Sequence, residues 1–127
     1  MSPELAALAE QEYVRLTTYR ASGDPVGTPV WIAPDGDDLL VTTGAASGKV
    51  KRLAHTPTVE LSPCDVRGTV PSGAVPVVAT AVVDDSAATR DRVAAAMKRK
   101  YGLKYRILDL GNRLRGGSNS VSLVIRP

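Results

Sequence analysis

Two strand-like segments separated by an Asp-Gly turn constrain the fold of this chain more than any other feature. Every second residue of "VGTPVWIA" (26–33) is Val, Thr or Ile, and "LLVTT" (39–43) follows the turn "PDGDD". Strict alternation predicts half-buried strands, and Asp-Gly between two such segments is a strong hairpin signal. Pro29 cannot donate a hydrogen bond to a neighbouring strand, so its strand is expected to have a free edge or a bulge. With a further strand at 13–20, the sequence predicts a three-stranded meander.

Beyond residue 43 the sequence predicts three more strands and helices between them. Ser86 is expected to cap a helix at 86–102, and Gly102 is expected to end it. Six strands with hairpin spacing and interposed helices favour a mainly β fold, a small β-barrel with helical decoration, in one domain spanning residues 1–127. The further strands are predicted at 58–65, at 74–84 and around Val121, Leu123 and Ile125, with a short second helix at 103–111.

Charge and composition restrict the class of protein. The chain has 127 residues and a net charge of only +3, which argues against a dedicated nucleic-acid binder. No apolar run approaches the roughly 20 residues that span a bilayer, and the acidic start does not resemble a secretory signal. The single cysteine, Cys64, excludes an internal disulfide. We therefore expect a cytoplasmic protein that binds neither nucleic acid nor membranes.

The stretch "SGKVKRLAHTP" places three cations directly after a predicted strand. Ser47 is a suitable helix N-cap, and Pro57 ends any helix that precedes it. Lys49 and Arg52 are three residues apart and share a helix face, whereas Lys51 points elsewhere. A phosphate at this point would meet a hydroxyl, two cations and free backbone N–H groups. A short connector whose charges only face water explains the pattern equally well.

The chain lacks an obvious catalytic side chain. The only histidine, His55, is expected on the surface, and Cys64 is interpreted as a small buried hydrophobic residue rather than a nucleophile. Aromatic residues make up 4% of the chain, so platforms for stacking bases are scarce. A protein of this kind is still an enzyme if a bound cofactor carries the reaction.

The order of motifs in residues 20–65 resembles the split β-barrel flavoproteins related to pyridoxamine 5′-phosphate oxidase. Within them it is most similar to the group that uses the deazaflavin coenzyme F420. The resemblance rests on "GDP" (23–25), the "LL" strand (39–40), Lys49 in a turn and Pro57 before the next strand. These elements occur in the same order as in that group.

The resemblance implies a six-stranded split β-barrel of the FMN-binding type and a homodimer with the cofactor in a groove between two barrels. The cofactor ring would lie against the second and third strands, and its phosphate at the basic turn. The resemblance assigns Thr28, Val30, Val41, Thr42 and Thr43 to the ring pocket and Ser47, Lys49, Lys51 and Arg52 to the phosphate. It places Cys64 and Asp65 on the fourth strand near the cofactor.

The function that the resemblance implies is an F420-dependent reductase. Such an enzyme transfers a hydride from the reduced deazaflavin to an electrophilic small molecule, for example an enone or a quinone. An FMN-dependent oxidoreductase of the same fold is one alternative, and a non-catalytic protein that binds a flavin, a deazaflavin or haem is another. A nucleic-acid module is the least favoured. Arg106, Arg113 and Arg115 are interpreted as part of a solvated loop rather than as contacts to an acidic cofactor tail.

Overall fold

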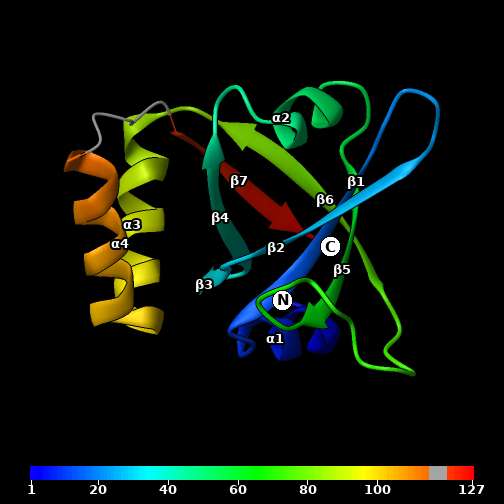
Figure 1. Cartoon of the computed structure of the whole chain (residues 1–127), viewed down its shortest axis with the longest axis horizontal. Coiled ribbons are helices and arrows are strands. Elements are labelled where there is room, and N and C mark those ends of the chain that lie inside the picture. Colours follow the sequence, from blue (N-terminus) through cyan, green and yellow to red (C-terminus); the bar gives the residue numbers. More distant parts are fainter. Residues whose placement is uncertain (115–119) are drawn as a thin grey trace.

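A curled antiparallel sheet of seven strands forms the body of the protein (Figure 1). The computed structural model describes residues 1–114 and 120–127, and the side chains of all these residues except 109–114. The strands are β1 (Tyr13–Tyr19), β2 (Pro25–Val30), β3 (Ala33–Asp35), β4 (Asp38–Gly44), β5 (Thr58–Cys64), β6 (Val77–Asp84) and β7 (Ser120–Arg126). Their order across the sheet is β2-β1-β5-β6-β7-β4-β3.

The two edge strands of this sheet are neighbours in the chain. β2 ends at Val30 and β3 begins at Ala33, so Trp31 and Ile32 alone connect opposite edges. The three peptide units between Val30 and Ala33 reach at most about 10 Å, so the sheet has to curl until its edges meet. The barrel is closed in this way by a short connection rather than by a continuous ladder.

This closure corrects the predicted meander. The segment 26–33 is divided between two strands, so the sheet has seven strands instead of six. β2 pairs with β1, whereas β4 pairs with β3 and β7 and not with β2. The expected hairpin is present, with Asp35 opposite Asp38 and Gly36 at a φ of 61°. The position of β2 at an edge of the sheet confirms the expectation from Pro29.

The described residues form four helices: α1 (Pro3–Ala9), α2 (Gly48–Leu53) and α3 (Ala87–Tyr101) pack on the barrel, and α4 (Leu103–Leu114) packs on α3. The predicted ends of α3 are confirmed, because the Ser86 hydroxyl accepts a hydrogen bond from the Thr89 N–H and Gly102 follows the last turn. α4 extends three residues beyond the predicted helix, and α1 has no counterpart in the sequence-based assignment. Trp31 stacks on Tyr101 of α3 with ring centroids 4.3 Å apart, which fixes α3 to the β2–β3 junction.

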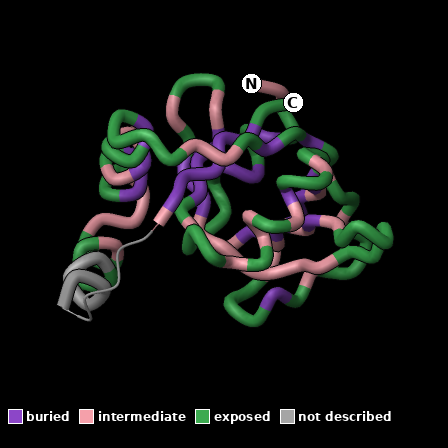
Figure 2. Tube along the Cα trace, turned by 90° about the horizontal axis from the view of Figure 1, so that it is seen from above, coloured by how far each residue is buried: buried purple, intermediate pink, exposed green. Residues whose placement is uncertain are grey.

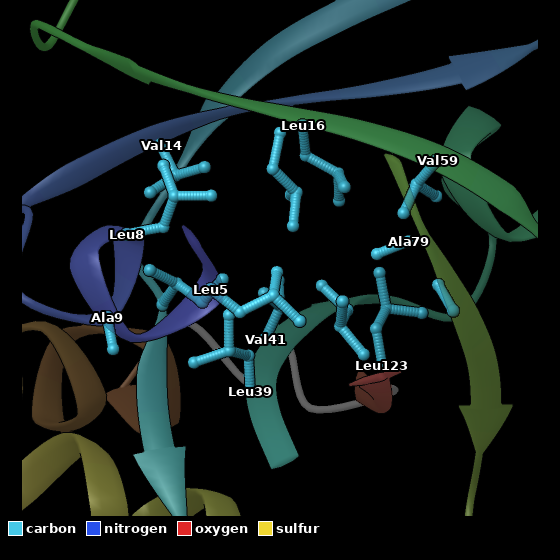
Figure 3. Packing of buried hydrophobic residues seen from close by; sticks show 14 of the residues in the cluster. Leu5, Leu8, Ala9, Val14, Leu16, Leu39, Val41, Val59, Ala79 and Leu123 are labelled. Carbon is cyan, nitrogen blue, oxygen red and sulfur yellow. The ribbon is translucent and has the colours of Figure 1, made fainter. Parts of the chain in front are cut away.

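Side chains of alternate strand positions fill the inside of the barrel (Figure 3). Leu16, Leu39 and Leu123 come from three different strands and are completely buried, as the alternation in each strand predicts. α1 closes one end with Leu5 and Leu8, and the buried residues follow the sheet while the loops are exposed (Figure 2). A second cluster forms where α3 covers the outer face of the sheet, and it contains Ala33, Leu40, Val93, Ala96, Met97 and Val124.

Asp38 connects β4 to α3 and β7. Its carboxylate accepts hydrogen bonds from Nη2 of Arg92 at 3.0 Å and from Nε of Arg126 at 2.7 Å, and its side chain is 13% exposed. The hydrogen bond from Arg126 and then that from Arg92 hold the pKa of Asp38 below its usual value, although burial opposes them. The stability from this group is therefore present above the unfolded pKa of about 3.9 and is lost as the pH falls through the lower folded pKa.

The substitution Asp38→Asn is expected to lower the free energy of unfolding at about pH 7 by roughly 1–2 kcal/mol, because it removes the negative charge from the charge-assisted hydrogen bonds with Arg92 and Arg126. The difference from the unmodified protein should shrink as the pH falls below about 4. Urea unfolding across this pH range measures it. A difference that stays constant with pH would contradict the assignment.

Candidate cofactor site

The barrel wall is open between β2 and β4. Pairing of β3 with β4 ends at Ala33 opposite Leu40, and the next residues of β4 pair only with β7 on their other side. β2 pairs only with β1, so the edge that it turns toward β4 has no strand partner among the described residues. α2 follows β4 after a short turn and contacts β1, β4 and β6 at this end of the barrel (Figure 1). The residues of α2 and Thr43 at the end of β4 therefore lie together at this end of the barrel.

Arg52 is anchored on the barrel. Its Nε donates a hydrogen bond of 2.6 Å to Oγ1 of Thr18, a completely buried residue of β1. The guanidinium group lies over the first turn of α2, where a Cβ at Gly48 would be 2.5 Å from Nη1 of Arg52. A larger residue at Gly48 would displace this group, so the glycine permits the position that Arg52 adopts.

Lys49 lies beside Arg52, as the helical spacing predicts. Burial, and then the neighbouring Arg52 cation, lower the pKa of Lys49 from its usual value. Neither side chain has a carboxylate partner among the described residues, and Lys51 is exposed. Two adjacent cations of which neither is neutralised form a favourable environment for an anion such as a phosphate.

Ser47 has the backbone conformation of an N-cap residue, but its side chain makes no capping hydrogen bond. Instead its Oγ accepts a hydrogen bond of 3.2 Å from Oγ1 of Thr43 at the end of β4. The two hydroxyls therefore lie together at the start of α2. The structure brings together Thr43, Ser47, Lys49 and Arg52 from the predicted set.

Thr28 and Val30 lie on the inward face of β2. Thr28 is opposite Leu16 in the β1–β2 ladder, and Val30 is half-buried against the barrel core. Oγ1 of Thr28 is buried and has no hydrogen-bond partner among the described residues. An unpaired buried hydroxyl is unfavourable by roughly 1–3 kcal/mol and is a typical sign of a missing partner.

The three predicted residues on β4 divide between its two faces. Val41 is completely buried in the core and offers no surface to a ligand. Thr42 faces outward into a pocket of about 250 Å³ that it shares with Ser122 of β7 and Tyr105 of α4. Thr43 is half-buried on the inward side, where it contacts Ser47.

Cys64 and Asp65 lie at the far end of β5. Cys64 is opposite Tyr13, five residues along β1 from Thr18, which corresponds to about 16 Å at the rise of a strand. Cys64 is half-buried rather than buried, and burial raises the pKa of its thiol. Asp65 accepts hydrogen bonds from two N–H groups of its own turn, at Arg67 and Thr69. Within one chain, these two residues do not reach α2.

Sequence reasoning missed Thr18. The alternation in 13–20 places it on the same face as the apolar Val14 and Leu16, and a threonine on a core-facing face is the signal that identifies a buried hydroxyl. His55 is exposed, as expected. Arg106 is exposed on α4 instead of in a loop, whereas the Arg113 side chain and Arg115 lie outside the described residues.

Two further classes of site were searched in the described part of the chain. None of its helices has the length and hydrophobicity that crossing a membrane requires. Among the described residues, no three His, Cys, Asp or Glu side chains lie close enough together to hold a metal ion.

Comparison with known proteins identifies the family. The family model described as pyridoxamine 5′-phosphate oxidase matches residues 1–127, and no curated protein matches the sequence. The haem storage protein HutZ from Vibrio cholerae is 15% identical with a TM-score of 0.70, covering 99% of this chain and 89% of that chain. A conserved hypothetical protein from Mycobacterium tuberculosis is 20% identical with a TM-score of 0.69, and the match covers 98% of this chain and 79% of that chain. An F420 reductase is 23% identical with a TM-score of 0.58, and the match covers 95% of this chain and 90% of that chain.

These three identities are low, so the structural similarities support the fold and not a particular ligand. The shared fold agrees with the curled sheet seen here, whose two edge strands are joined by Trp31 and Ile32. The chain belongs to the pyridoxamine 5′-phosphate oxidase family, and its fold is the split β-barrel of that family.

Proposed function

We propose that this protein is an F420-dependent reductase that transfers a hydride from the reduced deazaflavin to an electrophilic small molecule such as an enone or a quinone. The observation that carries the proposal is the pair of cations Lys49 and Arg52, which have no carboxylate partner among the described residues and lie together on α2, directly after β4. The family membership and the fold shared with an F420 reductase support it.

The residues at the opening fit a phosphate-bearing cofactor. Lys49, Arg52 and Ser47 would hold the phosphate, and β2 with Thr28 and Val30 would lie against the ring. When bound, the coenzyme supplies a two-electron donor that carries carbon at the hydride position and reacts poorly with oxygen. The chain itself then binds and orients the coenzyme and the substrate, and it excludes water from the site. Solvent or substrate supplies the proton, so no strongly perturbed acid is required beside the ring.

FMN remains the first alternative because it also carries a phosphate. The cation pair does not separate these cofactors from haem, because Lys and Arg bind the carboxylates of haem as they bind a phosphate, and the haem storage protein HutZ shares this fold. The discriminating property is the reaction with oxygen, since reduced FMN is oxidised rapidly in air and a deazaflavin is not.

A homodimer with two equivalent cofactor sites is expected. Val78 and Val82 on the outer face of β6 are 62% and 51% exposed, and Cys64 lies on the same outer face through the β5–β6 pairing. Exposed apolar strand surface of this kind usually marks an interface. Light scattering at tens of micromolar protein tests this, and a pure monomer would contradict it.

The reaction is tested by mixing the protein with reduced F420 in air. Oxidised F420 should form only after an enone or a quinone is added, and little peroxide should accumulate. NADPH should not replace the reduced coenzyme, because the sequence contains no GxGxxG motif after a strand. Rapid oxidation in air by protein with bound FMN would support the alternative flavoprotein instead.

A further inference from the structure

Helix α4 carries an exposed apolar face at the edge of the molecule. Leu103, Ile107 and Leu108 are 70%, 64% and 50% exposed. Leu103 and Ile107 are four residues apart and share one face of the helix, whereas Tyr105 lies on the opposite face and packs against the cluster beneath α3. α4 lies beyond α3 as seen from the barrel (Figure 1), so the face with Leu103 and Ile107 points away from the body of the protein.

The segment around this face carries the excess positive charge of the protein. Residues 98–115 contain seven of the 16 Lys and Arg residues but only one of the 13 Asp and Glu residues. The rest of the chain has nine basic and twelve acidic residues. The segment is therefore strongly basic, although the net charge of the whole chain is only +3.

Two cations of this segment remain available to a partner. Lys98 and Arg106 are exposed and have no carboxylate partner among the described residues. Arg106 follows Leu103 by three residues, which places its side chain beside the apolar face. The other described cations of the segment are each held by a group elsewhere in the protein: Arg99, Lys100 and Lys104.

The apolar face and the cations together indicate which partner fits. An anionic lipid surface offers an apolar layer to Leu103 and Ile107 and headgroup phosphates to the neighbouring cations. A nucleic acid would neutralise the cations but would leave the aliphatic side chains without an apolar partner. A second copy of α4 would bring two basic segments together, and their like charges would repel each other.

We propose that α4 is a membrane-surface helix that binds anionic lipids, with Leu103 and Ile107 at the boundary of headgroups and acyl chains and Arg106 at the headgroups. A helix in this position lies along the surface and does not span the bilayer, so it does not need roughly 20 apolar residues. The expectation of no membrane binding considered only such spanning runs and not a short helix with one exposed apolar face.

Co-sedimentation of the full chain with lipid vesicles tests this role of α4, and no cofactor is added, so the result is independent of the proposed function. The protein should bind mixed vesicles of phosphatidylglycerol and phosphatidylcholine at least about tenfold more tightly than vesicles of phosphatidylcholine alone, because each basic residue near an anionic surface contributes a factor of about five. Binding should weaken in about 1 M salt, which screens charges beyond about 3 Å.

Matched substitutions separate the face of α4 from exposure and charge in general. Ile107→Ser should weaken binding to the mixed vesicles by about fivefold or more, and Arg106→Gln by about fivefold. The controls Val75→Ser and Arg67→Gln change exposed residues of the loop 65–76, which lies on the other side of the barrel from α4 (Figure 1), and they should leave binding unchanged. All four positions are exposed, so the melting temperature should stay nearly constant.

Tryptophan fluorescence measures insertion directly. With Trp31 as a common background, the emission of Ile107→Trp should shift to the blue when mixed vesicles are added, and that of Val75→Trp should not. Equal binding to both kinds of vesicle, equal effects of Ile107→Ser and Val75→Ser, or no blue shift in Ile107→Trp would overturn the proposal. Conversion of a dimer into a monomer by Ile107→Ser, seen by light scattering without lipid, would also overturn it, because the face would then belong to a second copy.

Discussion

Lys49→Ala is expected to weaken the binding of F420 by about tenfold or more while the melting temperature stays almost unchanged. A charge-assisted hydrogen bond to a phosphate contributes roughly 1.5–3 kcal/mol to binding. In the free protein, Lys49 has no carboxylate partner among the described residues and lies beside the Arg52 cation, which lowers its pKa. Its removal therefore costs the fold little. Equilibrium titration and calorimetry measure the two quantities.

The matched control for this prediction is Lys51→Ala. Lys51 lies two residues after Lys49 on the same short helix, but it is exposed and does not share the face of Lys49 and Arg52. Its loss should change the affinity by much less than the loss of Lys49. Equal losses for the two substitutions would mean that the total charge of α2 determines binding and that the face shared by Lys49 and Arg52 has no special role.

Arg52→Ala is expected to lower both the affinity and the stability. The substitution removes the donor to Thr18, which leaves a completely buried hydroxyl unpaired at a cost of roughly 1–3 kcal/mol. It also removes the second cation beside Lys49, so F420 binding should weaken at least as much as in Lys49→Ala. The melting temperature should fall by several degrees, in contrast to Lys49→Ala.

A second substitution separates the two effects of Arg52. Adding Thr18→Val to Arg52→Ala removes the unpaired hydroxyl and should recover part of the lost stability, because replacing both partners by apolar groups is far less costly than orphaning one. The affinity for F420 should not recover. An unchanged melting temperature in Arg52→Ala would show that the bond to Thr18 does not anchor α2.

Local patterns in the sequence predicted most of the strands but not how the sheet closes. Alternation and the Asp-Gly turn determine where a strand lies and which of its faces is inward, and the hairpin at Gly36 follows from them. They do not determine which strand is the neighbour. Alternation runs unbroken from 26 to 33, so the change of partner at Trp31 and Ile32 leaves no local signal. That change depends on the apolar faces of distant strands.

The same limit applies to the candidate site. Helical spacing correctly predicted that Lys49 and Arg52 are neighbours, because side chains three residues apart on a helix lie on the same face. The role of Thr18 and the separation of Cys64 from α2 depend on strand register, which the sequence alone does not state. The family resemblance predicted which residues belong to the site. It did not predict that Val41 is completely buried in the core, because burial depends on how the strands pack.

The most direct measurement is the dissociation constant of the pure protein for F420, FMN, FAD and haem, each repeated with Lys49→Ala. The resemblance of residues 20–65 to the F420-dependent group leads us to expect that F420 binds most tightly. Because Lys49 and Arg52 form a cation pair without a described carboxylate partner, the affinity for F420 should fall about tenfold or more with Lys49→Ala. Tight binding of FMN or haem together with no measurable affinity for F420 would contradict the proposed function.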